Sequence, residues 1–97
     1  MDGKQQHKFL IHQRGDHVGV AVVDIEAGLS ATGVFMDDDS TIEVASHDAV
    51  PLGHKIAISP VPAGGTVLEY GTPIGTTNEG FETGDYVHVH NLRSARW

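Results

Sequence analysis

The chain has 97 residues, enough for one domain with a modest core and little room for a deep pocket of its own. Its formal net charge is -7, from 6 basic and 13 acidic residues, which disfavours nucleic acid because that partner requires clustered Lys and Arg. Cysteine is absent, which excludes disulfides and thiolate metal sites and fits a reducing cytoplasm.

Short β-strands separated by tight turns, with little or no helix, are the structure that the sequence predicts. Twelve glycines, four prolines and many β-branched residues favour them, and no stretch has the apolar periodicity of a useful helix. The polar segment 1–7 is expected to be a flexible tail without signal-peptide features, and 8–97 a single domain without a membrane span. Strands are expected at 8–12, 18–23, 33–36, 41–44, 55–58, 66–70 and 86–90.

A short pattern recurs along the chain at 24–28, 60–64 and 80–84. In each copy an apolar residue is followed three residues later by a glycine, and an expected strand comes next. We expect the apolar residue to anchor a turn in the core. The glycine is expected to adopt a backbone conformation that a Cβ would oppose.

His88 and His90 lie two residues apart in the last expected strand. Side chains alternate between the two faces of a strand, so both imidazoles are expected on the face opposite Val87 and Val89. Such a pair suits a metal ion, a substrate carboxylate or a proton. Zinc-type sites have three or four protein ligands, so the other ligands would be water, substrate or a partner chain. Asn91 suits either a substrate contact or the turn that closes the strand.

Two further segments carry candidate residues. His54 and Lys55 follow a glycine at a strand entry, where consecutive side chains face opposite ways, so only a bend would bring both to one site. Each is a candidate for contact with an anion. In the alternative interpretation, His54 caps a turn and Lys55 is exposed to solvent. Residues 70–75 form a shaped loop whose N–H groups suit an anion, or else a plain β-turn with Tyr70 packed across it.

The remaining polar residues are interpreted as structural. The acidic run 37–39 lacks the ligand spacing of a calcium loop and is expected at the tip of a hairpin. His7, His12 and His47 are expected on the surface, and His17 on a loop before the second strand.

Taken in order, segments 15–21, 53–55, 70–75 and 84–91 resemble the SAF domain of the altronate and galactarate dehydratase family. The resemblance implies a β-clip fold, mainly β, with short bent strands. In the dehydratases this domain is joined to a much larger catalytic region. In the sulfo-lyase branch of the family a free-standing copy is a small subunit beside a separate large one. The ending 91–97 is more similar to that free-standing copy.

The resemblance also implies a β-elimination. Members of the family remove a proton from the carbon next to a carboxylate, and water or sulfite leaves from the neighbouring carbon; sulfolactate gives pyruvate. This chemistry needs a base that works near ambient pH, and a divalent metal such as iron(II) or cationic donors to stabilise the enediolate. The implied residues are His54 and Lys55 for catalysis, Tyr70 and Asn91 for substrate binding, and His88 and His90 for a metal shared with the large subunit.

The sequence is compatible with three functions. In the first, the chain is the small subunit of a two-subunit acid lyase; it is inactive alone and acts with a large catalytic subunit on a small anionic hydroxy acid. Alternatively, it belongs to a sugar-acid dehydratase, or it is a non-catalytic β-clip module that binds a carbohydrate or a protein. In each case a site of useful size needs a partner chain or a second copy of this one. No nucleic acid or membrane partner is expected.

Overall fold

The computed structural model describes residues 7–77, 79–87 and 93–94. Every regular element in these residues is a strand, which confirms the mainly β prediction, and no helix there is long and apolar enough to cross a membrane. The strands are β1 (Phe9–Ile11), β2 (Val18–Ala21), β3 (Ser30–Phe35), β4 (Thr41–Ala45), β5 (Lys55–Ala57), β6 (Thr66–Glu69), β7 (Thr72–Thr76), β8 (Tyr86–Val87) and β9 (Arg93–Ser94).

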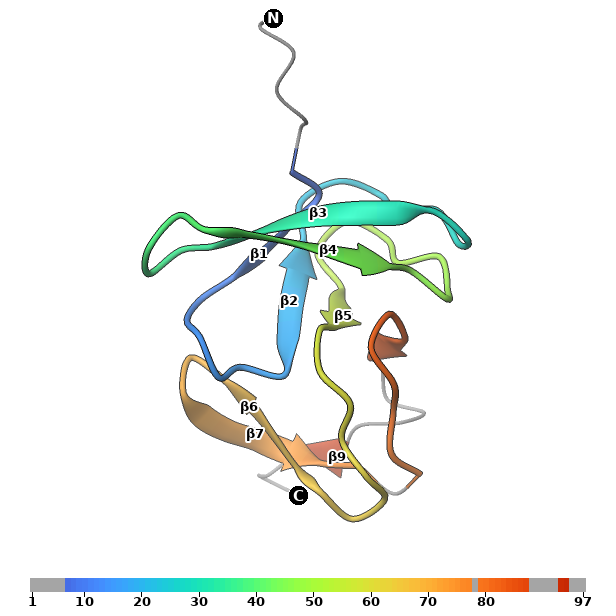
Figure 1. Cartoon of the computed structure of the whole chain (residues 1–97). Helices are drawn as coiled ribbons and strands as arrows, with labels where there is room; N and C mark the ends of the chain where they lie inside the picture. Colours follow the sequence, from blue (N-terminus) through green and yellow to red (C-terminus); the bar gives the residue numbers. More distant parts are fainter. Residues whose placement is uncertain (1–6, 78, 88–92, 95–97) are drawn as a thin grey trace, which may run out of the picture.

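The strands form two sheets. The larger has the order β4-β3-β1-β2-β5-β8, and the smaller has the order β6-β7-β9. β1 and β3 pair in parallel, with Phe9 opposite Gly33, whereas the other pairs are antiparallel. In Figure 1 the β3–β4 hairpin crosses one end of the molecule, β6 and β7 cross the other, and β2 and β5 run between them.

Two apolar clusters fill the interior of the described part of the chain. The first contains Phe9 and Ile56, both 0% exposed, and joins β1, β3, β4 and β5. The second contains Val18 and Val67, also 0% exposed, and packs the smaller sheet against β2, β5 and β8. Phe9 lies directly on Gly33, where a Cβ would come within 2.1 Å of the ring. A side chain at this position would therefore push β1 and β3 apart.

The recurring turn is confirmed in all three copies. The apolar residue of each copy is at most 3% exposed, its glycine has a positive φ, and a strand begins two residues after the glycine. The apolar residues are Ile25, Val61 and Phe81, and the glycines are Gly28, Gly64 and Gly84. These turns anchor the entries of β3, β6 and β8 in the core.

In the segment 70–75, the β-turn alternative is confirmed at residues 70–71, and residues 72–75 belong to strand β7 rather than to a loop. Tyr70 and Gly71 form a two-residue turn, and β7 follows at once and pairs with β6. Pro73 argues against a strand in the sequence because it has no N–H to donate. The structure accommodates it opposite Leu68, at an irregularity in the β6–β7 register, and β9 pairs with β7 only further along.

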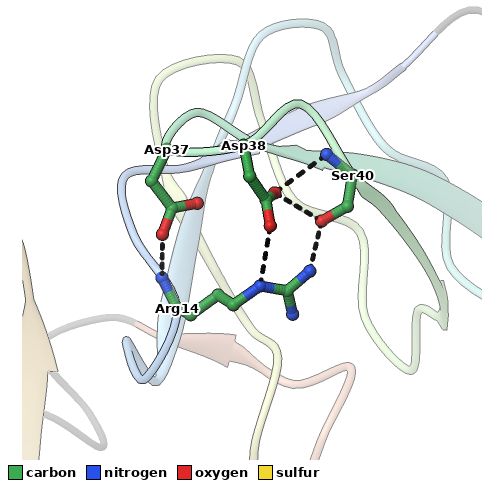
Figure 2. Close-up of polar contacts among 4 residues, drawn as sticks. All are labelled: Arg14, Asp37, Asp38 and Ser40. Carbon is green, nitrogen blue, oxygen red and sulfur yellow. Dashed lines mark hydrogen bonds and ion pairs between the residues drawn. The ribbon is translucent and has the colours of Figure 1, made fainter.

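The acidic run lies at the tip of the β3–β4 hairpin, as predicted, and Arg14 from the β1–β2 loop holds it (Figure 2). The backbone N–H of Arg14 donates to Asp37 Oδ2, and its Nε donates to Asp38 Oδ2, each at 3.0 Å. The guanidinium also donates to the Ser40 hydroxyl, and its carbon lies 4.6 Å from the centre of the Phe35 ring. Arg14 therefore ties the β1–β2 loop to this hairpin.

Acid should weaken this contact. Hydrogen bonds from the Ser40 side chain and backbone, followed by Arg14, lower the pKa of Asp38 from 3.8 to about 2. Because folding lowers this pKa, the ionised carboxylate stabilises the fold above pH 3.8, and the stabilisation is lost as the pH falls towards about 2. We expect Asp38→Asn to lower the melting temperature slightly near neutral pH, with the difference shrinking across this acid range. Thermal unfolding followed by circular dichroism measures both.

Asp39→Asn is the matched control, because it removes one charge from the same tip but none of the Arg14 hydrogen bonds. Asn also tolerates the positive φ of 63° at this position. The contrary result is a difference in melting temperature between Asp38→Asn and the wild type that is equally large at neutral pH and at about pH 2. That result would contradict the stabilising role of the ionised Asp38 carboxylate.

Candidate functional site

Tyr70 occupies an unusual position for a bulky residue. Its φ is 59° and that of Gly71 is 70°, so both residues of the β6–β7 turn lie in the left-handed region. That region costs a residue with a Cβ about 1–2 kcal/mol. The Tyr70 side chain is 62% exposed, so burial in the core does not explain why a tyrosine stands here. Strain of this kind concentrates at functional sites.

A buried carboxylate holds the turn. Asp16 is 2% exposed, and its two oxygens accept hydrogen bonds from the N–H groups of Tyr70 and Gly71, each at 2.9 Å. In the next residue, His17 Nδ1 accepts a hydrogen bond from the N–H of Leu68 at 2.9 Å. The β1–β2 loop is therefore bound to the end of β6, and the ring of His17 is engaged in that structural contact.

His12 follows β1 directly and lies against Tyr70. The two rings are stacked, with centroids 3.5 Å apart and planes 17° apart. His12 Nε2 lies 3.8 Å from Glu69 Oε2, and the His12 side chain is only 20% exposed. The prediction that His12 lies on the surface is only partly right, because the stack with Tyr70 leaves 20% of its side chain exposed.

Glu69 is a buried carboxylate between two basic side chains. It is 7% exposed and ends β6. Its Oε1 lies 4.0 Å from Lys55 Nζ, and its Oε2 faces His12. A buried carboxylate requires such partners, because taking an unpaired charge out of water is costly. We refer to His12, Lys55, Glu69 and Tyr70 together as the Glu69 cluster.

The Glu69 cluster combines three chemical capacities. An imidazole exchanges a proton near neutral pH. A lysine ammonium attracts a carboxylate or a sulfonate, more strongly where water is excluded. The exposed ring of Tyr70 offers a surface for a substrate or a partner chain to pack against. Removal of a proton next to a carboxylate requires a base and a nearby positive charge of this kind.

The predicted site residues divide between two places. Lys55 and Tyr70 are brought together through Glu69 and His12. His54 lies apart, with its Nδ1 at 2.7 Å from the Tyr86 hydroxyl and the two rings edge to face at 5.6 Å. Thus His54 and Lys55 reach different partners, as the alternation of side chains at the start of a strand predicts.

The predicted metal ligands His88 and His90, and the predicted substrate contact Asn91, lie outside the described residues. Within the residues that are described, no three His, Cys, Asp or Glu side chains are grouped so that they could hold a metal ion.

Three residues of the site, His12, Asp16 and Glu69, are not among the predicted site residues, and of these Asp16 lies in the segment 15–21 that carries part of the family resemblance. A signal for Glu69 exists, because it shares a strand face with Val67, which is buried. A carboxylate on the apolar face of a strand needs a basic partner. The sequence does not reveal that this partner is His12, because the β1–β2 loop and the end of β6 meet only in the folded chain.

The pattern of the altronate/galactarate dehydratase SAF domain matches residues 7–95, so the chain belongs to this family. It is 42% identical over 90 residues to the (2R)-sulfolactate sulfo-lyase subunit alpha of Chromohalobacter salexigens, covering 92% of this chain and 96% of that protein. The subunit alpha of Paracoccus pantotrophus is 36% identical over 64 residues, 66% of this chain and 96% of that protein. The altronate dehydratase of Bacillus subtilis is 36% identical over 88 residues, 89% of this chain but only 16% of that protein.

The left-handed conformation of Tyr70 should lower the stability of the turn. Two substitutions separate this effect from the loss of the tyrosine ring. Tyr70→Asn and Tyr70→Ala both remove the stack on His12, but Asn-Gly is the pair that such turns favour. We expect the Asn variant to exceed the Ala variant in free energy of unfolding by about 0.5–1 kcal/mol. Urea denaturation measures the difference. Equal stabilities would show that the turn does not strain residue 70.

Proposed function

We propose that this chain is the small subunit of a two-subunit acid lyase that removes sulfite from sulfolactate and leaves pyruvate. The Glu69 cluster carries the proposal: a histidine, a lysine and an exposed, strained tyrosine meet around one buried carboxylate. The similarity to subunit alpha of the (2R)-sulfolactate sulfo-lyases, over nearly the whole length of those proteins, supports the substrate and the role as a subunit. The absence of cysteine is compatible with a cytoplasmic location.

The predicted catalytic pair is His54 and Lys55. In this proposal Lys55 is the residue of the pair that reaches the substrate. Its ammonium binds an acid group of sulfolactate and stabilises the enediolate, whose negative charge grows as the proton leaves. Tyr70 packs against the substrate, and Asn91 orients one of its oxygens. His54, whose Nδ1 contacts the Tyr86 hydroxyl, is the other catalytic candidate of the pair. Lys55 and Tyr70 remain partly exposed, so the large subunit is needed to close the site.

We further propose that His88 and His90 hold a divalent metal, iron(II) or a similar ion, together with ligands from the large subunit. The fit rests on the chemistry of the donors, because imidazole nitrogens suit such ions. When bound, the metal supplies Lewis-acid stabilisation of the enediolate oxygens.

A second candidate function is the dehydration of a sugar acid, altronate or galactarate. The altronate dehydratase of B. subtilis aligns with 89% of this chain, which favours this alternative over unrelated activities. The same cluster would serve, because both reactions begin with loss of a proton next to a carboxylate.

The proposed function predicts that activity requires both subunits. This chain and its large subunit should each be inactive alone with sulfolactate, whereas the mixture should co-elute in gel filtration and form pyruvate and sulfite. Altronate and galactarate are assayed in parallel, and turnover of these acids instead of sulfolactate would assign the chain to the dehydratases. Two results would contradict a catalytic role: full activity of the large subunit alone, or no activity of the mixture on any of the three acids. Either result would indicate that this chain is a non-catalytic binding module.

Metal removal provides a separate test. Treatment of the complex with a chelator should abolish activity, and iron(II) or a similar ion should restore it. Replacement of His88 and His90 by Ala should lower the metal content of the purified complex, measured by mass spectrometry. His7→Ala, which removes an exposed histidine, is the control. Unchanged metal content in the double variant would rule out these ligands.

A further inference from the structure

We propose that His12 takes the proton from the substrate carbon, and that Glu69 is a positioning residue that orients the His12 imidazole. The inference rests on the proposed function and deepens it, because it assigns the base of the reaction to this chain. No sequence motif pointed to either residue; the assignment comes from their contacts with each other, with Tyr70 and with Lys55.

The surroundings of the other histidines suit proton transfer less well. His17 Nδ1 already accepts a backbone N–H, and His54 Nδ1 contacts a tyrosine hydroxyl. His47 pairs with a carboxylate at 2.9 Å, but its side chain is 55% exposed. Among the histidines that the structure describes with these contacts, His12 combines a buried carboxylate, a stacked ring and a nearby lysine.

The geometry gives the two His12 nitrogens different roles. Nε2 faces Glu69, so a proton on Nε2 points to the carboxylate and leaves the lone pair on Nδ1 to act as the base. The stack with Tyr70 restricts the plane of the ring. The separation of 3.8 Å exceeds hydrogen-bond length, and such contacts tighten when the substrate closes the site.

Lys55 faces the other oxygen of the same carboxylate. The carboxylate of Glu69 therefore holds the Lys55 ammonium at one oxygen and the His12 imidazole at the other. In the proposal, Lys55 binds an acid group of the substrate, and the adjacent carbon reaches His12 Nδ1, which points away from Glu69. Glu69 also offsets the positive charge that His12 acquires when it takes the proton.

In this step sulfolactate loses a proton from C2 and sulfite from C3. His12 Nδ1 takes the proton from C2, and the electrons of that C–H bond form the C2=C3 double bond. The C3–S bond breaks, and its electron pair leaves with sulfite. The enol that remains accepts a proton at C3, for which the His12 imidazolium is the donor, and loses its hydroxyl proton to water, which gives pyruvate. No oxidant or reductant is needed.

The test measures kcat and KM of the two-subunit complex with sulfolactate. His12→Gln should lower kcat by about 10²–10⁴, the usual contribution of a general base, with little change in KM. Glu69→Gln should lower kcat by less, again with little change in KM. His47→Gln is the matched control, because it removes another histidine that pairs with a carboxylate, and it should keep the wild-type kcat.

The outcomes separate this inference from the proposed function. A wild-type complex that is inactive with sulfolactate overturns both. An active wild-type complex whose kcat survives His12→Gln overturns the role of His12 alone. If His12→Gln prevents assembly in gel filtration, Glu69→Gln decides, since it keeps the histidine and the stack: a lowered kcat supports the proposal and an unchanged kcat overturns it.

Discussion

The carboxylate of Asp16 accepts hydrogen bonds from two successive N–H groups in the Tyr70–Gly71 turn, and the candidate site depends on this contact. Bonds of this charge-assisted kind contribute about 1.5–3 kcal/mol each, and an unpaired buried carboxylate would be costly. Arg14, two residues earlier, fastens the same loop to the β3–β4 hairpin (Figure 2). With the loop held at both places, His12 at its start has little freedom to leave Tyr70.

Several features of the site oppose stability when each is taken alone. Tyr70 adopts a left-handed conformation with its ring mostly exposed, and Glu69 is a buried acid at the end of a strand. Its two basic partners lie at 3.8 and 4.0 Å, which is close enough for attraction but longer than a hydrogen bond. A chain that only needed a stable hairpin would be better served by Asn-Gly at the turn and an apolar residue at the end of β6. The proposed chemistry, shared with a second subunit, would account for these choices.

The sequence predicted the parts of the fold that depend on local rules. The apolar-to-glycine turns, such as Ile25 to Gly28, were predictable because burial and a positive φ each favour particular residue types. β7 was not predictable in this way, since Pro73 is tolerated only through a local irregularity in its pairing with β6. The site divides similarly. Lys55 and Tyr70 were found through motif and resemblance, whereas Glu69 and His12 gain their meaning only from contacts between distant segments.

The small size of the domain is consistent with a site that needs residues from a second chain to be complete. In this account the described part of the chain supplies a cation, a base and an aromatic surface, and the large subunit supplies the rest of the enclosure. The most direct test is a crystal structure of the two-subunit complex with 3-sulfopropanoate, which lacks the hydroxyl group of sulfolactate. The account predicts that an acid group of this analogue contacts Lys55, with His12 and Tyr70 beside it and the large subunit opposite. An analogue enclosed by the large subunit alone, with the Glu69 cluster facing solvent, would contradict it.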